Sequence, residues 1–454
     1  MKESKYDKIE KAERSMPSVA GGLGWLVWSG TASVANSVLL WIFIARWRDA
    51  EELGRFTIVM GLYALFYNVC ALGLSPYLVS EISRRRERNL TADGGEKNII
   101  FRFIGSAAIF LTASGTVCAA LMAASVFFVS DSAPVRVAAV VLSAALVPTG
   151  AITLAETVAV SFGRARLMAI VTTLENALRT VVPLILILLG YPMWAICLSF
   201  VAVRIVALGV YLLAAGKNLA LFAFDRNDFA ALAKVAPTFA GTIIFASLNW
   251  QIPIILLARL SAETESARFG VASRFLIPAA IFAASYACSM QPALIRHYEK
   301  SVGAAASYLS RMASYALILT AAAAMLAPLL SRVVLTALFG EKYADAAQTL
   351  EILAVSVVPF SLVIIAARGL VAANAQHVDL FANIFGAAIG LCAGLLLVPK
   401  YGAVGAATAQ MLSFFLMSLV VVGYLSFRMK GFWLWRAAAV SFVGLLIILP
   451  IIWK

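Results

Sequence analysis

Charged side chains lie within apolar stretches that are long enough to cross a membrane, and six of them are candidates for a functional role. They are Arg179, Arg204, Arg274, Arg368, Glu156 and Glu175. A charge at the centre of a membrane helix costs about 2.5–3.5 kcal/mol on insertion scales, so such side chains face protein or water. The planar donor array of a guanidinium group matches a phosphate or pyrophosphate group. We therefore expect the four arginines to line a central cationic cavity that binds the anionic head of a substrate.

One of these arginines has an acidic neighbour on its own predicted helix. Glu175 and Arg179 are four residues apart on one helical face, so a structural ion pair is the alternative interpretation of both. Arg204, Arg274 and Arg368 have no acidic residue at that spacing. The predicted interior of the protein therefore carries a net positive charge.

Uncharged polar side chains in the same stretches could bind the hydroxyl groups of a sugar. The candidates are Asn36, Asn176, Asn249 and Gln251. The alternative for each is an interhelical hydrogen bond, worth about 0.6 kcal/mol on average, and for any single residue this alternative is favoured. Taken together, we expect the four side chains to line the cavity.

The elements that carry these side chains are membrane helices. Of the 454 residues, 62% are hydrophobic and 13% are charged, whereas soluble domains carry about 25% charged residues. A span needs about 20 apolar residues that satisfy their own backbone hydrogen bonds, which predicts an all-α integral membrane protein. We expect thirteen spans, the last of which could instead be an interfacial segment: 21–45, 54–80, 99–129, 136–161, 168–190, 192–215, 235–258, 269–293, 312–338, 347–373, 378–398, 403–427 and 434–453.

Basic residues in the loops predict a cytoplasmic N-terminus, because loops rich in lysine and arginine resist translocation. Five such residues lie in segment 1–20 and five more in 81–98. This distribution accounts for most of the formal net charge of +13 without any role in binding nucleic acid.

The chain also contains a weak internal repeat. Residues 36–56 and 249–269 are identical at seven of 21 positions, and 163–194 aligns by hydropathy with 374–405 at an offset of 211. Six predicted helices separate the copies, so both halves have the same orientation and a pseudo-twofold axis along the membrane normal is expected. We expect an N-lobe at 21–215, a cytoplasmic linker at 216–234, a C-lobe at 235–427 and one additional helix at 434–453.

The sequence shows no arrangement of residues that is typical of a catalytic site. The two histidines have no ligand-type neighbours, the five cysteines lie in apolar segments, and no nucleophile set, phosphate loop or metal-ligand spacing stands out. The longest predicted outer loop has about ten residues, whereas a membrane polymerase or ligase needs a larger extramembrane region. The sequence predicts a protein that is not an enzyme and has no metal or cofactor.

Three stretches resemble the bacterial polysaccharide transporter family of the multidrug/oligosaccharidyl-lipid/polysaccharide (MOP) flippase superfamily. They are "ARWRDAEELGRF", "LFGEKYADAAQTLEILAVS" and "AANAQHVDLFANIFGAAIGLCAGLLLVPKYGAVGAATAQ", in which "YGAVGAA" is the most characteristic motif. The resemblance implies two six-helix lobes around a cavity that is cationic in the polysaccharide members. Members of the family commonly have twelve or fourteen spans. With thirteen spans, the side of the membrane on which the C-terminus lies is not fixed by the resemblance.

The resemblance also implies a function. Such a protein moves an undecaprenyl-pyrophosphate-linked oligosaccharide from the inner to the outer leaflet of the bacterial plasma (inner) membrane, for O-antigen, capsule or exopolysaccharide synthesis. Its expected partners are that substrate, membrane lipids and a polysaccharide polymerase with other assembly proteins. Coupling to an H⁺ or Na⁺ gradient would use an intramembrane carboxylate, for which Glu156 and Glu175 are the candidates.

Three alternatives remain at this stage. A lipid II flippase of the same superfamily would share a basic cavity. A multidrug antiporter would prefer an acidic cavity for cationic drugs, and a membrane polysaccharide polymerase or ligase would need larger outer loops.

Overall fold

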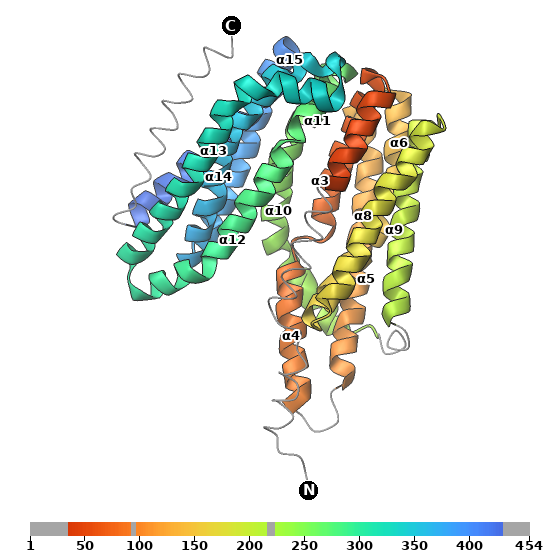
Figure 1. The fold of residues 1–454 in the computed structure, drawn as a ribbon. Coiled ribbons are helices and arrows are strands. Elements are labelled where there is room, and N and C mark those ends of the chain that lie inside the picture. The colour runs from red at the N-terminus through yellow and green to blue at the C-terminus, as the bar shows by residue number, and fades with distance from the viewer. Residues whose placement is uncertain (1–34, 92–96, 216–222, 430–454) are drawn as a thin grey trace. The chain divides into compact units, whose positions relative to one another are not determined.

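The computed structural model describes residues 35–91, 97–215 and 223–429. Within these ranges the chain forms helices joined by short turns, and no strand is present (Figure 1). The helices are, in chain order, Ala35–Trp47, α3 (Ala50–Cys70), α4 (Ser75–Thr91), α5 (Lys97–Val129), α6 (Ala133–Ser143), α7 (Leu146–Ser161), α8 (Ala165–Leu188), α9 (Met193–Ala215), α10 (Arg226–Leu260), α11 (Glu263–Ser273), α12 (Leu276–Lys300), α13 (Val302–Phe339), the 3₁₀ helix η2 (Glu341–Ala346), α14 (Ala347–Ala372) and α15 (Gln376–Arg428).

In the described ranges, ten helical segments are long and apolar enough to cross a membrane. One of them, α15, contains two of the predicted spans, 378–398 and 403–427, which are separated by the non-helical backbone of Gly402. The first predicted span is described only from residue 35, and the predicted segments 1–20 and 434–453 lie outside the described residues. The protein is a multi-pass, all-α membrane protein, as predicted.

Three of the spans are interrupted, which their hydropathy did not indicate. Residues 71–74 separate α3 from α4, where Leu72 and Gly73 have φ angles of 50° and 67°. A short turn separates α6 from α7, and Arg274 and Phe275 separate α11 from α12. At the last break, the amides of Arg274 and Phe275 bond to carbonyls three residues back, at 3.3 Å each, which is a 3₁₀ pattern.

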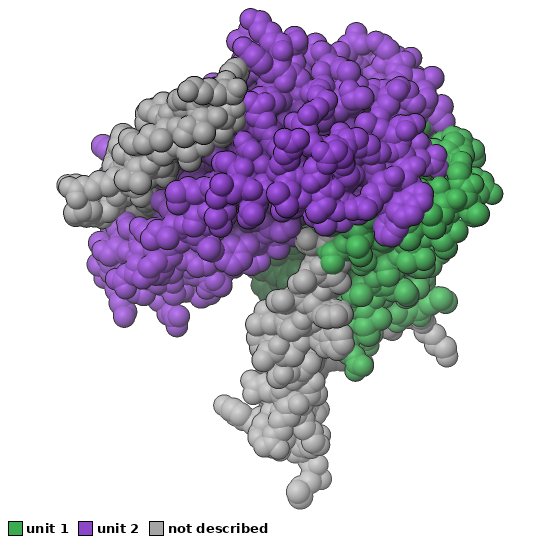
Figure 2. Space-filling view, turned by 45° about the horizontal axis from the view of Figure 1, so that its top comes forward, with its two compact units in different colours: residues 1–40, 66–123, 138–240 green, residues 41–65, 124–137, 241–454 purple. Residues whose placement is uncertain are grey.

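The chain divides into two compact units (Figure 2). Unit 1 comprises residues 1–40, 66–123 and 138–240, and unit 2 comprises 41–65, 124–137 and 241–454. Neither unit is continuous in sequence, because α3, α5, α6 and α10 each contribute residues to both. The lobe boundaries predicted from the sequence, and the pseudo-twofold axis between the lobes, stay predictions.

Within each unit, the helices pack against one another through apolar side chains. In unit 1, α4, α5 and α10 share a cluster that includes Leu78, Phe103, Leu111 and Leu232, each at most 1% exposed. In unit 2, α12, α13 and α14 pack side by side (Figure 1), and α14 is buried on most of its faces. A helix that is apolar and buried all round occupies the interior of its unit.

Two turns in the aligned repeat segments have the same backbone geometry. Gly163, after α7, has φ 72°; its amide bonds to Val160 O, and the next amide bonds five residues back, to Ala159 O. Asn374, after α14, has φ 53°; its amide bonds to Val371 O, three residues back, and the next amide, of Ala375, bonds five residues back, to Leu370 O. Both are Schellman turns, which need a left-handed residue and take glycine or asparagine there. They lie 211 residues apart, the offset of the predicted alignment.

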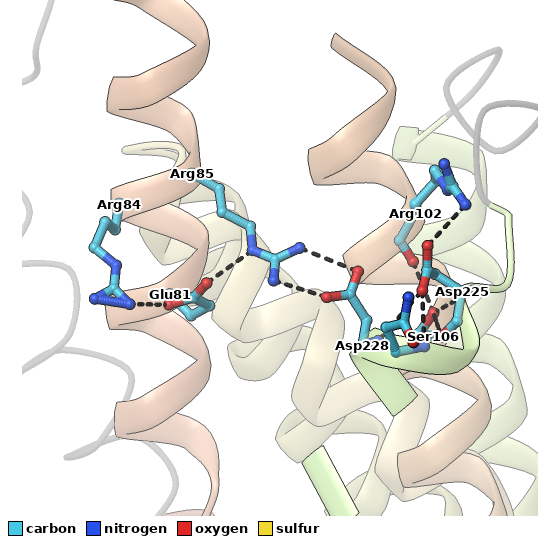
Figure 3. A network of polar contacts seen from close by, with 8 residues as sticks. Glu81, Arg84, Arg85, Arg102, Ser106, Asp225 and Asp228 are labelled. Atoms are coloured by element: carbon cyan, nitrogen blue, oxygen red, sulfur yellow. Dashed lines mark hydrogen bonds and ion pairs between the residues drawn. The ribbon is translucent and has the colours of Figure 1, made fainter. Parts of the chain in front are cut away.

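A polar network fixes the start of α10 within unit 1 (Figure 3). Arg85 of α4 donates to both carboxylate oxygens of Asp228, at 2.7 and 3.1 Å, and to Glu81 at 2.8 Å. Asp225 pairs with Arg102 of α5 at 2.7 Å, and its amide donates to the Ser106 hydroxyl at 2.8 Å. The network thus joins α4 and α5 to the first turn of α10.

Asp225 also caps α10. Its Oδ1 atom accepts hydrogen bonds from the backbone amides of Asn227 at 2.8 Å and Asp228 at 3.4 Å. These two amides, helped by the Arg102 guanidinium, hold the pKa of the Asp225 carboxyl below its usual value of 3.8.

Candidate functional site

A cluster of buried charges lies within unit 1. Glu175 of α8 forms an ion pair with Arg204 of α9 at 2.9 Å and lies 3.7 Å from Arg179, one turn along its own helix. The side chains of Glu175 and Arg204 are 5% and 4% exposed. Arg204, which lacks an acidic partner in its own helix, therefore obtains one from the neighbouring helix. The structure contradicts the interpretation of Arg204 as an unpaired charge.

Aromatic rings and a second carboxylate complete this cluster. The guanidinium of Arg179 lies 5.1 Å from the Phe200 ring centroid, and that of Arg204 lies 5.0 Å from the Tyr67 centroid, within the range of cation–π attraction. Glu156 of α7 is in electrostatic range of both Arg204 and Glu175. The cluster therefore combines two guanidinium groups with two carboxylates, which makes it neutral when all four are ionised.

Two of the predicted amide residues lie on or beside α8. The Asn176 side chain donates to the Thr172 carbonyl at 2.8 Å, one turn back on the same helix. The Thr180 hydroxyl bonds to the carbonyls of both Asn176 and Asn36, at 3.1 and 3.2 Å. This hydrogen bond of Asn176 lies within α8, so it is not the interhelical bond that the alternative interpretation describes.

A second polar network lies within unit 2 and is centred on Asn249 of α10. Its side-chain amide donates to the Asn383 carbonyl at 2.9 Å, and its side-chain oxygen accepts from the Ser413 hydroxyl at 3.1 Å. Asn383 in turn donates to the Asp379 carbonyl at 2.9 Å. Gln251 is two residues further along α10 and so points about 200° away from Asn249. The network therefore includes Asn249 and not Gln251.

Arg274 lies at the break between α11 and α12. Its guanidinium stacks on the Trp41 ring at 3.9 Å from the centroid, and Trp41 is only 2% exposed. Its Nε atom has a long contact of 3.4 Å to the Gly270 carbonyl. Among the residues that the structure describes, no carboxylate lies within ion-pair distance of Arg274. A partly buried guanidinium with no counter-charge among the described residues is suited to bind an anion.

Arg368 of α14 is also in unit 2. Its Nη1 atom donates to the side-chain oxygen of Gln291, on α12, at 3.2 Å. It is in electrostatic range of Asp379, which is part of the Asn249 network. Arg368 therefore has an amide and a carboxylate nearby, whereas no described carboxylate lies within ion-pair distance of Arg274.

Comparison with known proteins assigns the family. A family model described as "Polysaccharide biosynthesis protein" matches residues 19–298, more than half of the chain. The chain belongs to this family. Comparison with curated protein sequences finds no match.

Solved structures share the fold of this family member. They include the lipid II flippase MurJ in an inward closed conformation (14% identity, TM-score 0.73, covering 94% of this chain and 93% of that one). A multidrug resistance MATE family transporter of the MOP superfamily in an inward-facing conformation also matches (14%, 0.71, 88% and 95%). A third is a MOP superfamily transporter from Pyrococcus furiosus, which is described by the reverse polarity of its binding pocket (14%, 0.59, 90% and 93%). At these identities the likeness shows the fold alone, which is that of MOP superfamily transporters.

The structure brings some of the predicted site residues together. The first group, in unit 1, contains Arg179, Arg204, Glu156 and Glu175. Unit 2 contains Arg274, Arg368, Asn249 and Gln251. That all four arginines face one cavity stays a prediction, because the two groups belong to different units.

Several residues of these networks were missed by reasoning from the sequence. They are Tyr67, Gln291, Asp379 and Ser413. Asp379 could have been identified from the sequence, since it is an acidic residue in the first turn of a predicted span. The others are common residue types in membrane helices, and only tertiary contacts distinguish them.

Proposed function

We propose that this protein is a flippase that moves an undecaprenyl-pyrophosphate-linked oligosaccharide from the cytoplasmic to the outer leaflet of the bacterial plasma membrane. Its membership of the polysaccharide biosynthesis family and its MOP transporter fold support this function. Under this proposal the N-terminus is cytoplasmic, the protein carries out no covalent chemistry, and a polysaccharide polymerase uses the delivered substrate.

The observation that carries the proposal is the environment of Arg274. A guanidinium that is stacked on a buried tryptophan and has no carboxylate partner in the described chain is expensive to keep in a membrane protein. A pyrophosphate supplies the missing negative charge and accepts several N–H donors at once. In this proposal Arg274 binds the pyrophosphate, with Arg368 as a second cation in the same unit.

Sugar hydroxyls need donors and acceptors rather than charges. The Asn249 network supplies amides and a serine hydroxyl in unit 2, and Asn36, Asn176 and Gln251 are further candidates for sugar contacts. Only the polar head has to cross the membrane, because the polyprenyl tail can stay in the lipid throughout.

Energy for transport against a gradient comes, in this proposal, from inward flow of H⁺ or Na⁺. The charged cluster of unit 1 supports this step, because Glu156 shares a buried site with Glu175 and Arg204. Binding of a proton or Na⁺ at Glu156 would neutralise its charge and leave Glu175 as the acidic partner of Arg204 and Arg179. Replacing both glutamates by glutamine is expected to abolish gradient-driven flipping, and an unchanged rate in the double variant would argue against coupling at this cluster.

The decisive experiment is flipping by the purified full-length protein in liposomes. A fluorescent polyprenyl-pyrophosphate sugar is followed by leaflet-selective quenching in the wild type, in Arg274→Ala and in Arg311→Ala, an exposed control. We expect flipping by the wild type and the control, and loss in Arg274→Ala.

The same vesicles separate the alternative functions. Lipid II is added as a second substrate, since one solved structure with this fold is a lipid II flippase, and an organic cation as a third. Transport of lipid II alone would assign the protein to that substrate. Export of organic cations with no movement of either lipid would overturn the proposal.

A further inference from the structure

Unit 1 contains an apolar cavity that the transport proposal does not use. It has a volume of about 410 Å³ and lies between α5, α7, α8 and α9. Its wall is formed mainly by aliphatic and aromatic side chains, including Phe101, Leu154, Ala155, Leu208 and Tyr211. Ligand sites in proteins commonly have volumes of about 300–1,000 Å³, so the cavity is large enough for part of a lipid.

The cavity has the depth of one leaflet. Its lining runs from Ala151 in α7 to Phe162, the residue directly after that helix, which corresponds to about 16 Å at 1.5 Å per residue. Half of a bilayer's hydrocarbon core is about 15 Å thick. An extended acyl chain of one leaflet therefore matches the cavity in length as well as in polarity.

Two arginines mark one end of the cavity. Arg164, in the turn before α8, lines it directly. The guanidinium of Arg86, on α4, lies 5.2 Å from the centroid of the Phe162 ring, which also lines the cavity, and donates to the Ser161 carbonyl at 3.0 Å. Arg164 and Arg86 form no ion pair with any carboxylate whose side chain the structure describes. They place two positive charges at this end of the cavity.

We propose that this cavity binds an anionic phospholipid, with one acyl chain along α7 and α9 and the phosphate beside Arg164 and Arg86. Guanidinium groups bind phosphate oxygens by charge-assisted hydrogen bonds, and basic residues near a membrane surface select anionic head groups. The polyprenyl tail of a lipid-linked sugar is several times longer than an acyl chain, so it does not fit a cavity of one-leaflet depth. The site is distinct from the Arg274 and Asn249 residues of unit 2.

Photo-labelling of the full-length protein tests this site. The protein is reconstituted in phosphatidylcholine vesicles that contain a small fraction of phosphatidylglycerol with a diazirine in its acyl chain. After irradiation, labelled peptides are mapped by mass spectrometry. We expect labelling of α7 and α9 to exceed labelling of Leu326, Leu329 and Val333, which are exposed positions on α13.

Matched variants test the head-group contact. One arginine near a membrane surface contributes a factor of about five in binding an anionic lipid. Arg164→Gln is therefore expected to reduce labelling of α7 and α9 about five-fold, whereas Arg311→Gln, the same charge change on α13, leaves it unchanged. Ala155→Phe fills the cavity and is expected to abolish the labelling. The arginine variant leaves the apolar wall intact, so the test does not depend on folding of the phenylalanine variant.

Three outcomes would overturn the proposal. The first is labelling of α7 and α9 no stronger than that of α13. The second is equal labelling by a phosphatidylcholine probe with the same diazirine, since the head group would then not matter. The third is stronger labelling by a polyprenyl-phosphate probe, which would assign the cavity to the transported lipid.

Discussion

At the scale of single residues, Glu175 is the acidic partner of two arginines. Its carboxylate lies 2.9 Å from Arg204 and 3.7 Å from Arg179. Removing one partner of a buried ion pair leaves an uncompensated charge and costs about 3–5 kcal/mol, whereas replacing the whole pair by apolar groups is often neutral. Glu175 therefore has a structural role that can be measured separately from transport.

We expect Glu175→Gln to lower the free energy of unfolding by about 3 kcal/mol or more. The double variant Glu175→Gln/Arg204→Met should be less destabilised than the single variant, because the buried Arg204 charge is removed together with its partner. Unfolding in detergent, followed by circular dichroism, gives both values and their coupling energy. Additive losses in the double variant would mean that the two side chains do not interact.

A second prediction at the scale of residues concerns the stacking of Arg274 on Trp41. Lysine keeps the positive charge but lacks the planar donor array and the stacking surface of arginine. Since hydrogen bonds to charged groups contribute about 1.5–3 kcal/mol, Arg274→Lys is expected to reduce flipping by roughly ten-fold or more. Arg311→Lys is the control. Full flipping activity of Arg274→Lys would mean that a positive charge at this position is enough for transport and that the planar donor array is not needed.

At the scale of elements, the start of α10 depends on pH through Asp225. Its pKa is lowered by two backbone amides and by Arg102, so the carboxylate stabilises the folded state above the pKa of the unfolded chain. That contribution is lost as the pH falls through the lower, folded-state pKa.

Asp225→Asn keeps a capping side chain but removes the charge. We expect the stability difference between wild type and this variant to be constant above about pH 5 and to disappear in strong acid. Thermal unfolding at a series of pH values measures it. A difference that persists unchanged at low pH would show that the charge of Asp225 is not involved.

The break within α15 explains the "YGAVGAA" motif. Gly402 has φ 51° and ψ −126°, a conformation that residues with a Cβ rarely adopt. The amide of Ala403, which starts the second helical part, donates to the Glu265 carboxylate at 2.8 Å. Glu265 also pairs with Arg268 at 2.6 Å. A carboxylate from α11 therefore caps the helix that follows the glycine.

Both parts of this cap can be tested by substitution. Gly402→Ala is expected to cost about 1–3 kcal/mol because of backbone strain, and its added methyl group would collide with the Glu265 carboxylate. Glu265→Ala is expected to cost about 1 kcal/mol, as for other lost caps. Glu299→Ala, at an exposed position on α12, is the control in thermal unfolding. No loss of stability in Glu265→Ala would contradict the capping role.

At the scale of the whole molecule, hydropathy was sufficient to predict the membrane class and most spans, because lipid requires about 20 apolar residues in every crossing. It did not predict the break at Arg274 and Phe275, although Pro278 lies in the first turn of the helix that follows the break. It also could not pair Arg204 with Glu175, since the two lie 29 residues apart on different helices. Such contacts depend on how helices pack, which a single sequence does not encode in local patterns.

The cluster of Arg179, Arg204, Glu156 and Glu175, which is neutral when all four groups are ionised, has an electrical consequence. A cation that binds there adds one full positive charge to the site, so its passage across the bilayer would be driven by the membrane potential at about 2.3 kcal/mol per 100 mV. If this cluster carries the proposed ion, flipping should accelerate when a potassium diffusion potential makes the side of ion release negative. Glu156→Gln should remove that acceleration. A wild-type flipping rate that does not depend on voltage would show that the cluster does not couple ion flow to flipping.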